Sequence, residues 1–326
     1  MSVLLLNATD VAGLAPTYAD IVALAQETYR MQAEGEVSVP PKIAVHPDGT
    51  PQTFLHAMPA WVAGARALGM KWVSFFPANS ARNVPDSTGI IILNDPDTGL
   101  PVAILEGMWI TYARTGACAA FAARALCSGA PRRLGLIGCG GLGRWSLRMI
   151  GAVLPSVEEV FVTSRRRETR EAFCAAMAAE GRWRLTPVDD VRSAVEGMDL
   201  VVSSVPKLRE HPVKEGWWSP GSVMIPLDVT GAWDDEIYAR ADRIACDGPE
   251  NLARALERYR PNLALDPART LALQELAAGR ISGRRQASER ILAFVTGIAS
   301  LDMALAWEIY RRALRERRGF AFDITA

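Results

Sequence analysis

The chain has 326 residues and carries 36 basic and 36 acidic side chains, so its formal net charge is zero. We therefore expect neither nucleic acid nor an anionic membrane as its main partner, because both attract basic surfaces. No apolar run is long enough to span a membrane, and residues 1–10 lack the basic start of a signal peptide. Five cysteines without C-x-x-C spacing indicate reduced thiols, so we expect a cytoplasmic protein. The length of the chain is typical of two domains.

The first third of the chain combines one predicted helix with turn-rich β segments. The helix covers 18–34, and the strands lie near three apolar stretches, 53–58, 71–76 and 89–93. Residues 91–105 predict a hairpin with a turn rich in Asp, Pro and Gly. A long helix over 111–127 then leads into a different pattern.

Residues from about 133 to 250 alternate short apolar strands with helical patterns, which is typical of a doubly wound parallel sheet. Strands are expected at six places: 133–138, 159–164, 184–188, 199–203, 222–227 and 243–247. Helices are expected over Asp190–Gly197, which opens with an N-cap signal, and over Ser288–Leu314 near the end. The simplest architecture is α/β: a Rossmann-type domain, 121–299, inserted in a second α+β domain formed by 1–120 and 300–326.

The most specific motif is Gly138-Cys139-Gly140-Gly141-Leu142-Gly143, called the glycine loop below, which lies between an apolar run and a helical pattern. G-x-G-x-x-G in this context predicts a dinucleotide site. Gly138 would permit the tight turn, Gly140 the approach of a pyrophosphate, and Gly143 the packing of helix on strand. The helix N-terminus would point its N–H groups and positive dipole end at the phosphates. An ordinary strand–turn–helix is the alternative.

The end of the second predicted strand favours a particular cofactor. NAD-specific sites usually have Asp or Glu there, whereas this chain has Ser164 followed by Arg165, Arg166 and Arg167. Guanidinium groups bind a 2′-phosphate through charge-assisted hydrogen bonds, and an acid would repel it. We therefore predict NADP(H) as the preferred cofactor, with NAD(H) possible. A solvated basic helix start is the alternative interpretation.

Three other polar residues stand in apolar surroundings. Lys71, one of only four lysines, begins an apolar strand, Arg114 opens an apolar helix, and Asp228 follows a sheet strand. Ligands of open α/β sheets bind at the carboxyl ends of the strands, where Asp228 is expected. The structural alternatives are a strand-edge charge, a surface residue at a helix start and an N-cap. The three histidines have no metal-ligand spacing to one another, so no metal site is expected.

Together these segments resemble the ornithine cyclodeaminase/μ-crystallin family over about 41–313. The shared stretches include Ile110-Thr111-x-x-Arg114-Thr115-Gly116-Ala117, the glycine loop, Ser203 to Pro206, and Asp228. The resemblance implies a homodimer whose N-terminal domain forms the subunit contact and the substrate site. It also implies a nicotinamide-dependent enzyme acting on small α-amino or α-imino acids.

The resemblance also implies roles for individual residues. It puts Lys71 and Arg114 at the substrate carboxylate and Asp228 beside the reacting carbon as a proton shuttle, so Asp228 and Lys71 are the expected catalytic residues. It aligns Ser164 and Arg165 with the cofactor-ribose site of the family. The further expected cofactor contacts are Arg166, Thr115, Ser203 and Val205, besides the glycine loop.

Lys42 marks a departure from the family pattern, because it stands where the cyclodeaminases have an arginine that also grips the carboxylate. Lysine keeps the charge and loses the bidentate fork. This exchange and the NADP(H) preference favour reduction over cyclisation. We therefore expect an NADPH-dependent reductase of a C=N bond next to a carboxylate, that is, a ketimine or cyclic imino acid reductase or an amino-acid dehydrogenase. The alternatives are an ornithine- or lysine-type cyclodeaminase with retained NAD(P), and a non-catalytic NADP-dependent ligand-binding protein.

Overall fold

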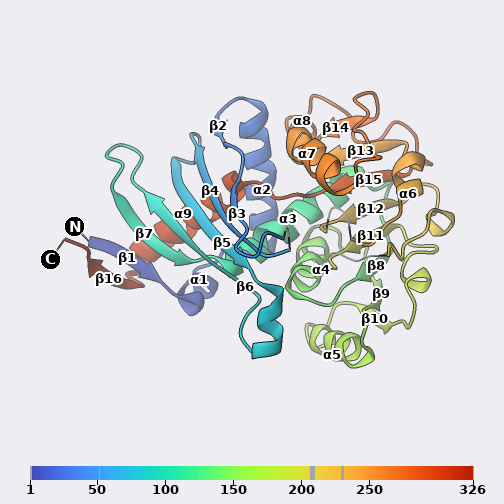
Figure 1. Cartoon of the computed structure of the whole chain (residues 1–326), viewed down its shortest axis with the longest axis horizontal. Helices are drawn as coiled ribbons and strands as arrows, with labels where there is room; N and C mark the ends of the chain where they lie inside the picture. Colours follow the sequence, from blue (N-terminus) through green and yellow to red (C-terminus); the bar gives the residue numbers. More distant parts are fainter. Residues whose placement is uncertain (1, 51, 206–209, 229–230, 326) are drawn as a thin grey trace. The chain divides into compact units, whose positions relative to one another are not determined.

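The computed structural model describes the chain except for residues 1, 51, 206–209, 229–230 and 326 (Figure 1). It divides the chain into two compact units, the first formed by Met1–Arg114 with Ile298–Ala326 and the second by Thr115–Gly297. The first unit contains a mixed sheet with helices and the second a parallel sheet with helices, so the expected fold class is confirmed. Among the helices that the structure describes, none has the length and hydropathy needed to cross a membrane.

The described part of the first unit contains an eight-stranded sheet. Its strands are β1 (Ser2–Leu6), β2 (Val37–Ser38), β3 (Ile43–Val45), β4 (Phe54–Val62), β5 (Ala67–Phe75), β6 (Ser87–Asn94), β7 (Pro101–Glu106) and β16 (Phe320–Asp323). Seven follow the order β16-β1-β7-β6-β5-β4-β2, and β3 also pairs with β4. The expected strands and hairpin correspond to β4, β5, β6 and β7, whereas β1, β2, β3 and β16 were not predicted.

Helix α9 (Ala299–Glu316) covers one face of this sheet by packing on β4, β5 and β6 (Figure 1). It also packs against α2 (Tyr18–Ala33), which confirms the first predicted helix. Because side chains alternate along a strand, Ala67, Gly69 and Lys71 of β5 share the buried face. A Cβ on Gly69 would lie 2.2 Å from the carbonyl oxygen of Ile92 and 3.1 Å from Met303 Sδ. Glycine thus lets β5 pack closely against both β6 and α9.

Helix α3 (Met108–Leu126) begins in the first unit and ends in the second, so the expected boundary near 120 falls within it. The carboxylate of Glu106 accepts hydrogen bonds from the backbone N–H groups of Met108 (2.6 Å) and Trp109 (3.0 Å). These bonds satisfy donors of the first turn, and the helix starts earlier than the expected residue 111. Arg114 therefore lies inside α3 rather than at its opening, which corrects the sequence-based interpretation.

The described part of the second unit contains eight parallel strands in the order β10-β9-β8-β11-β12-β15-β13-β14. They are β8 (Arg133–Ile137), β9 (Glu159–Thr163), β10 (Arg184–Pro187), β11 (Leu200–Ser203), β12 (Val223–Pro226), β13 (Arg243–Cys246), β14 (Thr270–Ala272) and β15 (Ile291–Phe294). The helices are α4 (Gly141–Val153), α5 (Arg167–Ala178), α6 (Asp235–Arg240), α7 (Pro249–Tyr259) and α8 (Leu273–Ala277). Strands β11, β12, β13 and β15 are buried along their lengths, as in a sheet covered on both faces. All six expected strands are confirmed.

Of two helix predictions in the second half of the chain, the first was wrong and the second is confirmed only from Ala299 onward. The stretch Asp190–Gly197 contains only a 3₁₀ turn, Arg192–Ala194, although Asp190 caps the backbone N–H of Ser193 at 2.8 Å. The stretch Ser288–Leu314 contains β15 followed by α9, with Gly297 at φ +73° between them. A short buried apolar run has the same composition in a strand and in a helix, so the pattern could not separate the two.

Candidate functional site

The glycine loop lies at the carboxyl end of β8, between the ends of its two neighbours. Gly138 donates to the carbonyl of Thr163 on β9, at 3.0 Å, and has φ +112°, a conformation that other residues rarely adopt. A Cβ on Gly138 would lie 2.5 Å from the carbonyl oxygen of Ser204, and one on Gly143 would lie 2.3 Å from that of Gly138. By contrast, a Cβ on Gly140 would meet no atom within 4 Å. The outer two glycines therefore close the turn, while Gly140 faces open space.

That open space can accept phosphate groups. Gly140 is the N-cap of α4, which begins Gly141-Leu142-Gly143, and no described side chain caps its first N–H groups. A cavity of about 230 Å³ adjoins the loop, lined by Gly138, Cys139, Gly140, Ser164, Arg165, Arg166, Thr169, Ser204 and Val205. Uncapped N–H groups and the positive end of the helix dipole favour anions at this position. These features fit the pyrophosphate of a dinucleotide.

The arginine run after β9 divides into paired and unpaired side chains. Arg167 is the first residue of α5 and pairs with Glu171 at 2.6 Å. Arg165 and Arg166 are exposed, and neither side chain has an ion pair or hydrogen bond with another residue in the described part of the chain. The backbone at Arg166 is held by Ser164, whose hydroxyl donates to the Arg166 carbonyl at 2.9 Å. Two exposed cations thus line the cavity beside the glycine loop.

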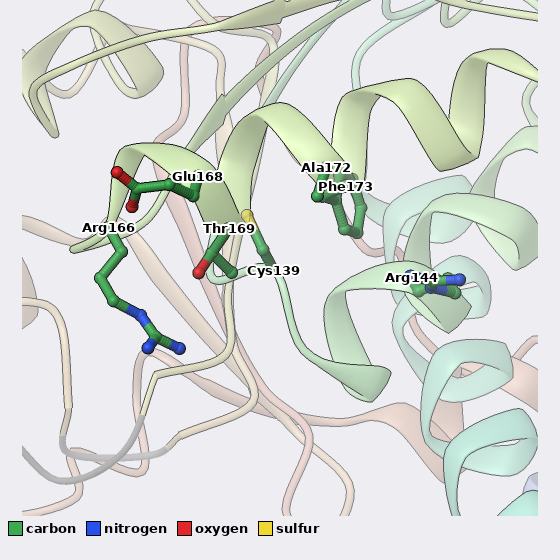
Figure 2. A pocket seen from close by; sticks show the side chains of 7 residues that line it. All are labelled: Cys139, Arg144, Arg166, Glu168, Thr169, Ala172 and Phe173. Carbon is green, nitrogen blue, oxygen red and sulfur yellow. The ribbon is translucent and has the colours of Figure 1, made fainter.

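Figure 2 shows a second cavity of the same unit, of about 560 Å³. It is lined by Cys139, Arg144, Arg166, Glu168, Thr169, Ala172 and Phe173. Glu168 and Thr169 extend from the start of α5, and Arg166 comes from the loop before it. The cavity continues the glycine-loop site past the end of β9, where a cofactor ribose and its substituents would lie.

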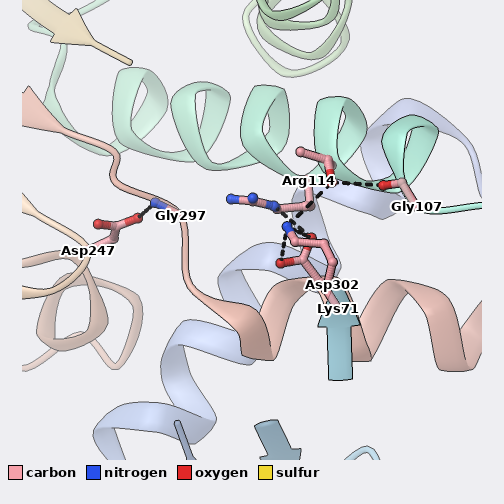
Figure 3. A network of polar contacts seen from close by, with 7 residues as sticks. Lys71, Gly107, Arg114, Asp247, Gly297 and Asp302 are labelled. Carbon is pink, nitrogen blue, oxygen red and sulfur yellow. Dashed lines mark hydrogen bonds and ion pairs between the residues drawn. The ribbon is translucent and has the colours of Figure 1, made fainter. Parts of the chain in front are cut away.

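Lys71 and Arg114 meet around a residue that the sequence analysis did not single out, Asp302 of α9 (Figure 3). Lys71 Nζ lies 2.7 Å from both carboxylate oxygens of Asp302, and Arg114 Nε lies 3.0 Å from Oδ1. Lys71 Nζ also donates to Thr111 Oγ1 at 3.3 Å, and Thr111 donates to the carbonyl of Gly107 at 2.7 Å. The carboxylate therefore accepts hydrogen bonds from both cations.

Burial rules out the structural alternatives considered for both basic residues. Lys71 lies in the middle of β5 and is 1% exposed, so it is not a strand-edge charge. Arg114 is 7% exposed, so it is not a surface residue at a helix start. Asp302 is 0% exposed and is the single acidic residue in the apolar run 298–306, which is the signal that could have identified it.

The electrostatics of this cluster favour an additional anion. Burial, the charge of Arg114 and the charge of Lys42 lower the pKa of Lys71 below its usual range, while the Asp302 carboxylate opposes this. Lys42, an exposed residue just before β3, is thus close enough to act on Lys71 through its charge. Among the described hydrogen bonds of this cluster, two cationic side chains share the one carboxylate of Asp302, an arrangement that favours a second anion such as a ligand carboxylate.

Asp228 lies just after β12 and is held by two loops of the second unit. Its Oδ2 accepts from the backbone N–H of Val205 at 3.1 Å, and its Oδ1 accepts from that of Gly231 at 3.2 Å. Burial raises the pKa of Asp228, and hydrogen bonds from Val205, Ser203 and Gly231 oppose the shift. The N-cap alternative is wrong, because α6 is capped by Asp234. A carboxyl group in such surroundings can hold or release a proton nearer neutral pH.

The expected site residues form two groups, one in each unit. Lys42, Lys71 and Arg114 belong to the first unit. The second unit holds the glycine loop, Ser164 to Arg166, Ser203, Val205 and Asp228 at the carboxyl ends of neighbouring strands. Thr115 is buried in α3, and Pro206 lies outside the described residues.

The chain is similar to known proteins over nearly its whole length. The sequence profile of the ornithine cyclodeaminase/mu-crystallin family matches residues 2–317. The nodulation efficiency protein NfeD of Rhizobium meliloti is 29% identical over 310 residues, which cover 94% of this chain and 93% of that protein. The structure of Thermococcus litoralis Δ1-pyrroline-2-carboxylate reductase with NADH and L-proline has a TM-score of 0.90 at 26% identity, covering 97% of this chain and 99% of the other. An archaeal alanine dehydrogenase dimer with bound NAD has a TM-score of 0.88 at 26% identity, covering 99% and 100%.

Proposed function

The chain belongs to the ornithine cyclodeaminase/mu-crystallin family, and on that premise we propose that it is an NADPH-dependent oxidoreductase that reduces a C=N bond next to a carboxylate. The product is an amino acid or a cyclic imino acid. The observation that carries this proposal is the buried cluster of Lys71, Arg114 and Asp302, in which two cationic side chains meet one carboxylate and favour a second one from the substrate. The similar reductase from Thermococcus litoralis, whose structure holds L-proline, acts on a substrate of this class.

In the first unit, Lys71 and Arg114 hold the carboxylate of the substrate. Arg114 provides a planar fork of N–H donors that matches a carboxylate, and Lys71 adds a compact charge. Lys42 adds a third positive charge near the cluster but has no fork. That difference favours the reductase over a cyclodeaminase, in which we expect an arginine at this place. Fixing the carboxylate orients the neighbouring carbon for reaction.

In the second unit, the glycine loop and the cavity beside it hold the dinucleotide. When bound, the cofactor supplies the hydride that reduces the imine carbon. Asp228 gives a proton to the imine nitrogen, which becomes basic as the C=N bond is reduced. Its raised pKa keeps it protonated to a higher pH than an exposed aspartate, and the Val205 and Gly231 N–H groups fix its orientation.

The preference for NADPH over NADH rests on Arg165 and Arg166. Both guanidinium groups are exposed at the cavities beside the glycine loop, whereas Arg167 is engaged with Glu171. A 2′-phosphate supplies the anion that these two side chains lack among the described residues. Thr115, Ser203 and Val205 complete the proposed cofactor contacts.

A homodimer is supported by an apolar surface on the first unit. The strand register puts Ile43, Trp72 and Ile90 in one cross-strand row, on the face of the sheet opposite to the buried Lys71. These three side chains and Val45 are between 40% and 65% exposed. Exposed apolar patches of this kind mark interaction surfaces, and the similar archaeal alanine dehydrogenase is a dimer.

The test is NADPH consumption with a panel of linear ketimine acids and cyclic imine acids, each matched with its primary amide as a control. We expect turnover of at least one acid and little turnover of its amide, because the amide has no negative charge for the Lys71–Arg114 pair. No turnover of any acid by enzyme that binds NADPH would refute the proposal. Ammonia release from ornithine or lysine without a net change in NADPH would instead support a cyclodeaminase.

A further inference from the structure

Asp302 combines complete burial with contacts to both proposed carboxylate-binding residues. It lies in the first turn of α9, far along the chain from Lys71 of β5 and Arg114 of α3. Two cations buried side by side repel each other, and each also pays the cost of leaving water. An anion between them offsets both effects, so the cluster needs Asp302 or an equivalent charge.

The hydrogen bonds show which protonation state the cluster fits. Thr111 gives its one hydroxyl proton to the Gly107 carbonyl, so it accepts from Lys71 Nζ. Lys71 Nζ also donates to both oxygens of Asp302. Three acceptors match the three N–H donors of an ammonium group, whereas a neutral amine has two. With its donors engaged, Lys71 acts on a ligand mainly through its charge.

We propose that Asp302 is a positioning residue for substrate binding, which keeps Lys71 protonated and fixes Lys71 and Arg114 as one carboxylate clamp. The inference rests on the proposed function in one respect, because it takes the substrate carboxylate as the ligand of the clamp. Asp302 acts through the two cations and is not itself a substrate contact. A merely structural ion pair would affect folding alone, whereas a positioning residue also controls the charge of Lys71.

The charged groups around Lys71 make the effect of Asp302 predictable. Arg114 on α3 and Lys42 before β3 both disfavour the ammonium form, and burial acts in the same direction. The strand neighbours opposite Lys71 are Met58 on β4 and Ile91 on β6, which carry no charge. Removal of the Asp302 charge therefore removes the influence that opposes burial, Arg114 and Lys42, all three of which lower the pKa of Lys71.

The experiment measures the titration of Lys71 by NMR in protein labelled with ¹³C at lysine Cε. The chain has four lysines, and the Lys71→Met variant assigns the signal. In Asp302→Asn we expect the midpoint to fall by about one pH unit or more. We also expect KM for the carboxylate substrate to rise about tenfold or more at pH 8 while kcat changes less, with a larger effect at higher pH. The control is Glu308→Gln on the same helix, which removes half-buried ion pairs with Arg312 and Arg315 and should change neither the Lys71 midpoint nor KM.

An unchanged Lys71 titration in folded Asp302→Asn overturns the inference, whatever the activity. If the titration shifts but the wild-type protein reduces no imine acid, the proposed function fails and the role of Asp302 in holding the charge of Lys71 stands. If Asp302→Asn does not fold, the variant Asp302→Glu tests the inference in its place. That variant keeps the charge on a longer side chain, so Lys71 should titrate within about half a pH unit of wild type while KM rises, and an unchanged KM contradicts the inference.

Discussion

The cofactor preference can be tested without knowing the substrate, by removing the charges of Arg165 and Arg166. The double variant Arg165→Gln/Arg166→Gln keeps polar side chains of similar size on an exposed loop. Neither guanidinium group is engaged with another described side chain, so the variant breaks no ion pair in the described part of the chain. We therefore expect its fold and thermal stability to match those of the wild type.

The expected loss follows from the number of phosphate contacts. A charge-assisted hydrogen bond in a dry site changes affinity by about tenfold or more, and solvent screening at these exposed groups reduces this to about 3- to 10-fold per arginine. The two together predict a Kd for NADPH that is about 10- to 100-fold higher. The Kd for NADH should change by about twofold or less, since NADH has no 2′-phosphate for these groups to bind.

The assay is a fluorescence titration of each protein with NADPH and with NADH. The matched control is Arg167→Gln, which removes an adjacent arginine of the same run that already pairs with Glu171 at 2.6 Å. It should leave both dissociation constants close to wild type. A salt series adds a second check, because the NADPH preference should weaken as ionic strength rises.

Two results would refute this reasoning. If the double variant binds NADPH as tightly as the wild type, the arginines are only a solvated helix start. If affinity for NADH falls as much as affinity for NADPH, the side chains act on parts that both cofactors share.

Three further predictions concern the glycine loop and Asp228. Asp228→Asn should lower kcat about 100-fold or more while leaving the Kd for NADPH within about twofold, because it removes the proton but not the cofactor site; an unchanged kcat would exclude Asp228 from proton transfer. Since burial raises the pKa of Asp228 and reduction needs its protonated form, kcat at saturating substrate should persist above the usual aspartate range and decline as pH rises through the raised value, a decline that a pH profile of kcat for Asp228→Asn should lack. Gly143→Ala places a Cβ 2.3 Å from a backbone oxygen and should lower the free energy of unfolding by about 2 kcal/mol or more. Gly140→Ala meets no atom within 4 Å, so it should unfold like wild type in denaturant but bind NADPH more weakly.

Local patterns predicted much of the second unit. Its parallel sheet is covered on both faces, so β8, β9, β11 and β12 are short apolar runs that can be recognised one at a time. The glycine loop could be identified for a similar reason, since a tight turn between a strand and a helix requires particular residues at fixed spacing. The same locality explains the failure at β15. A buried run of four apolar residues before an apolar helix has no periodicity that separates strand from helix.

Local patterns in the chain were enough to predict the dinucleotide fold, the family and the apolar surroundings of Lys71, Arg114 and Asp228. The contacts of those residues follow from the packing of distant segments and could not be predicted in this way. Lys71 and Asp302 are 231 residues apart, and no local pattern encodes which buried acid meets which buried base. Their pairing results from packing α9 on β5, where the cost of burying a charge selects an opposite charge at the point of contact.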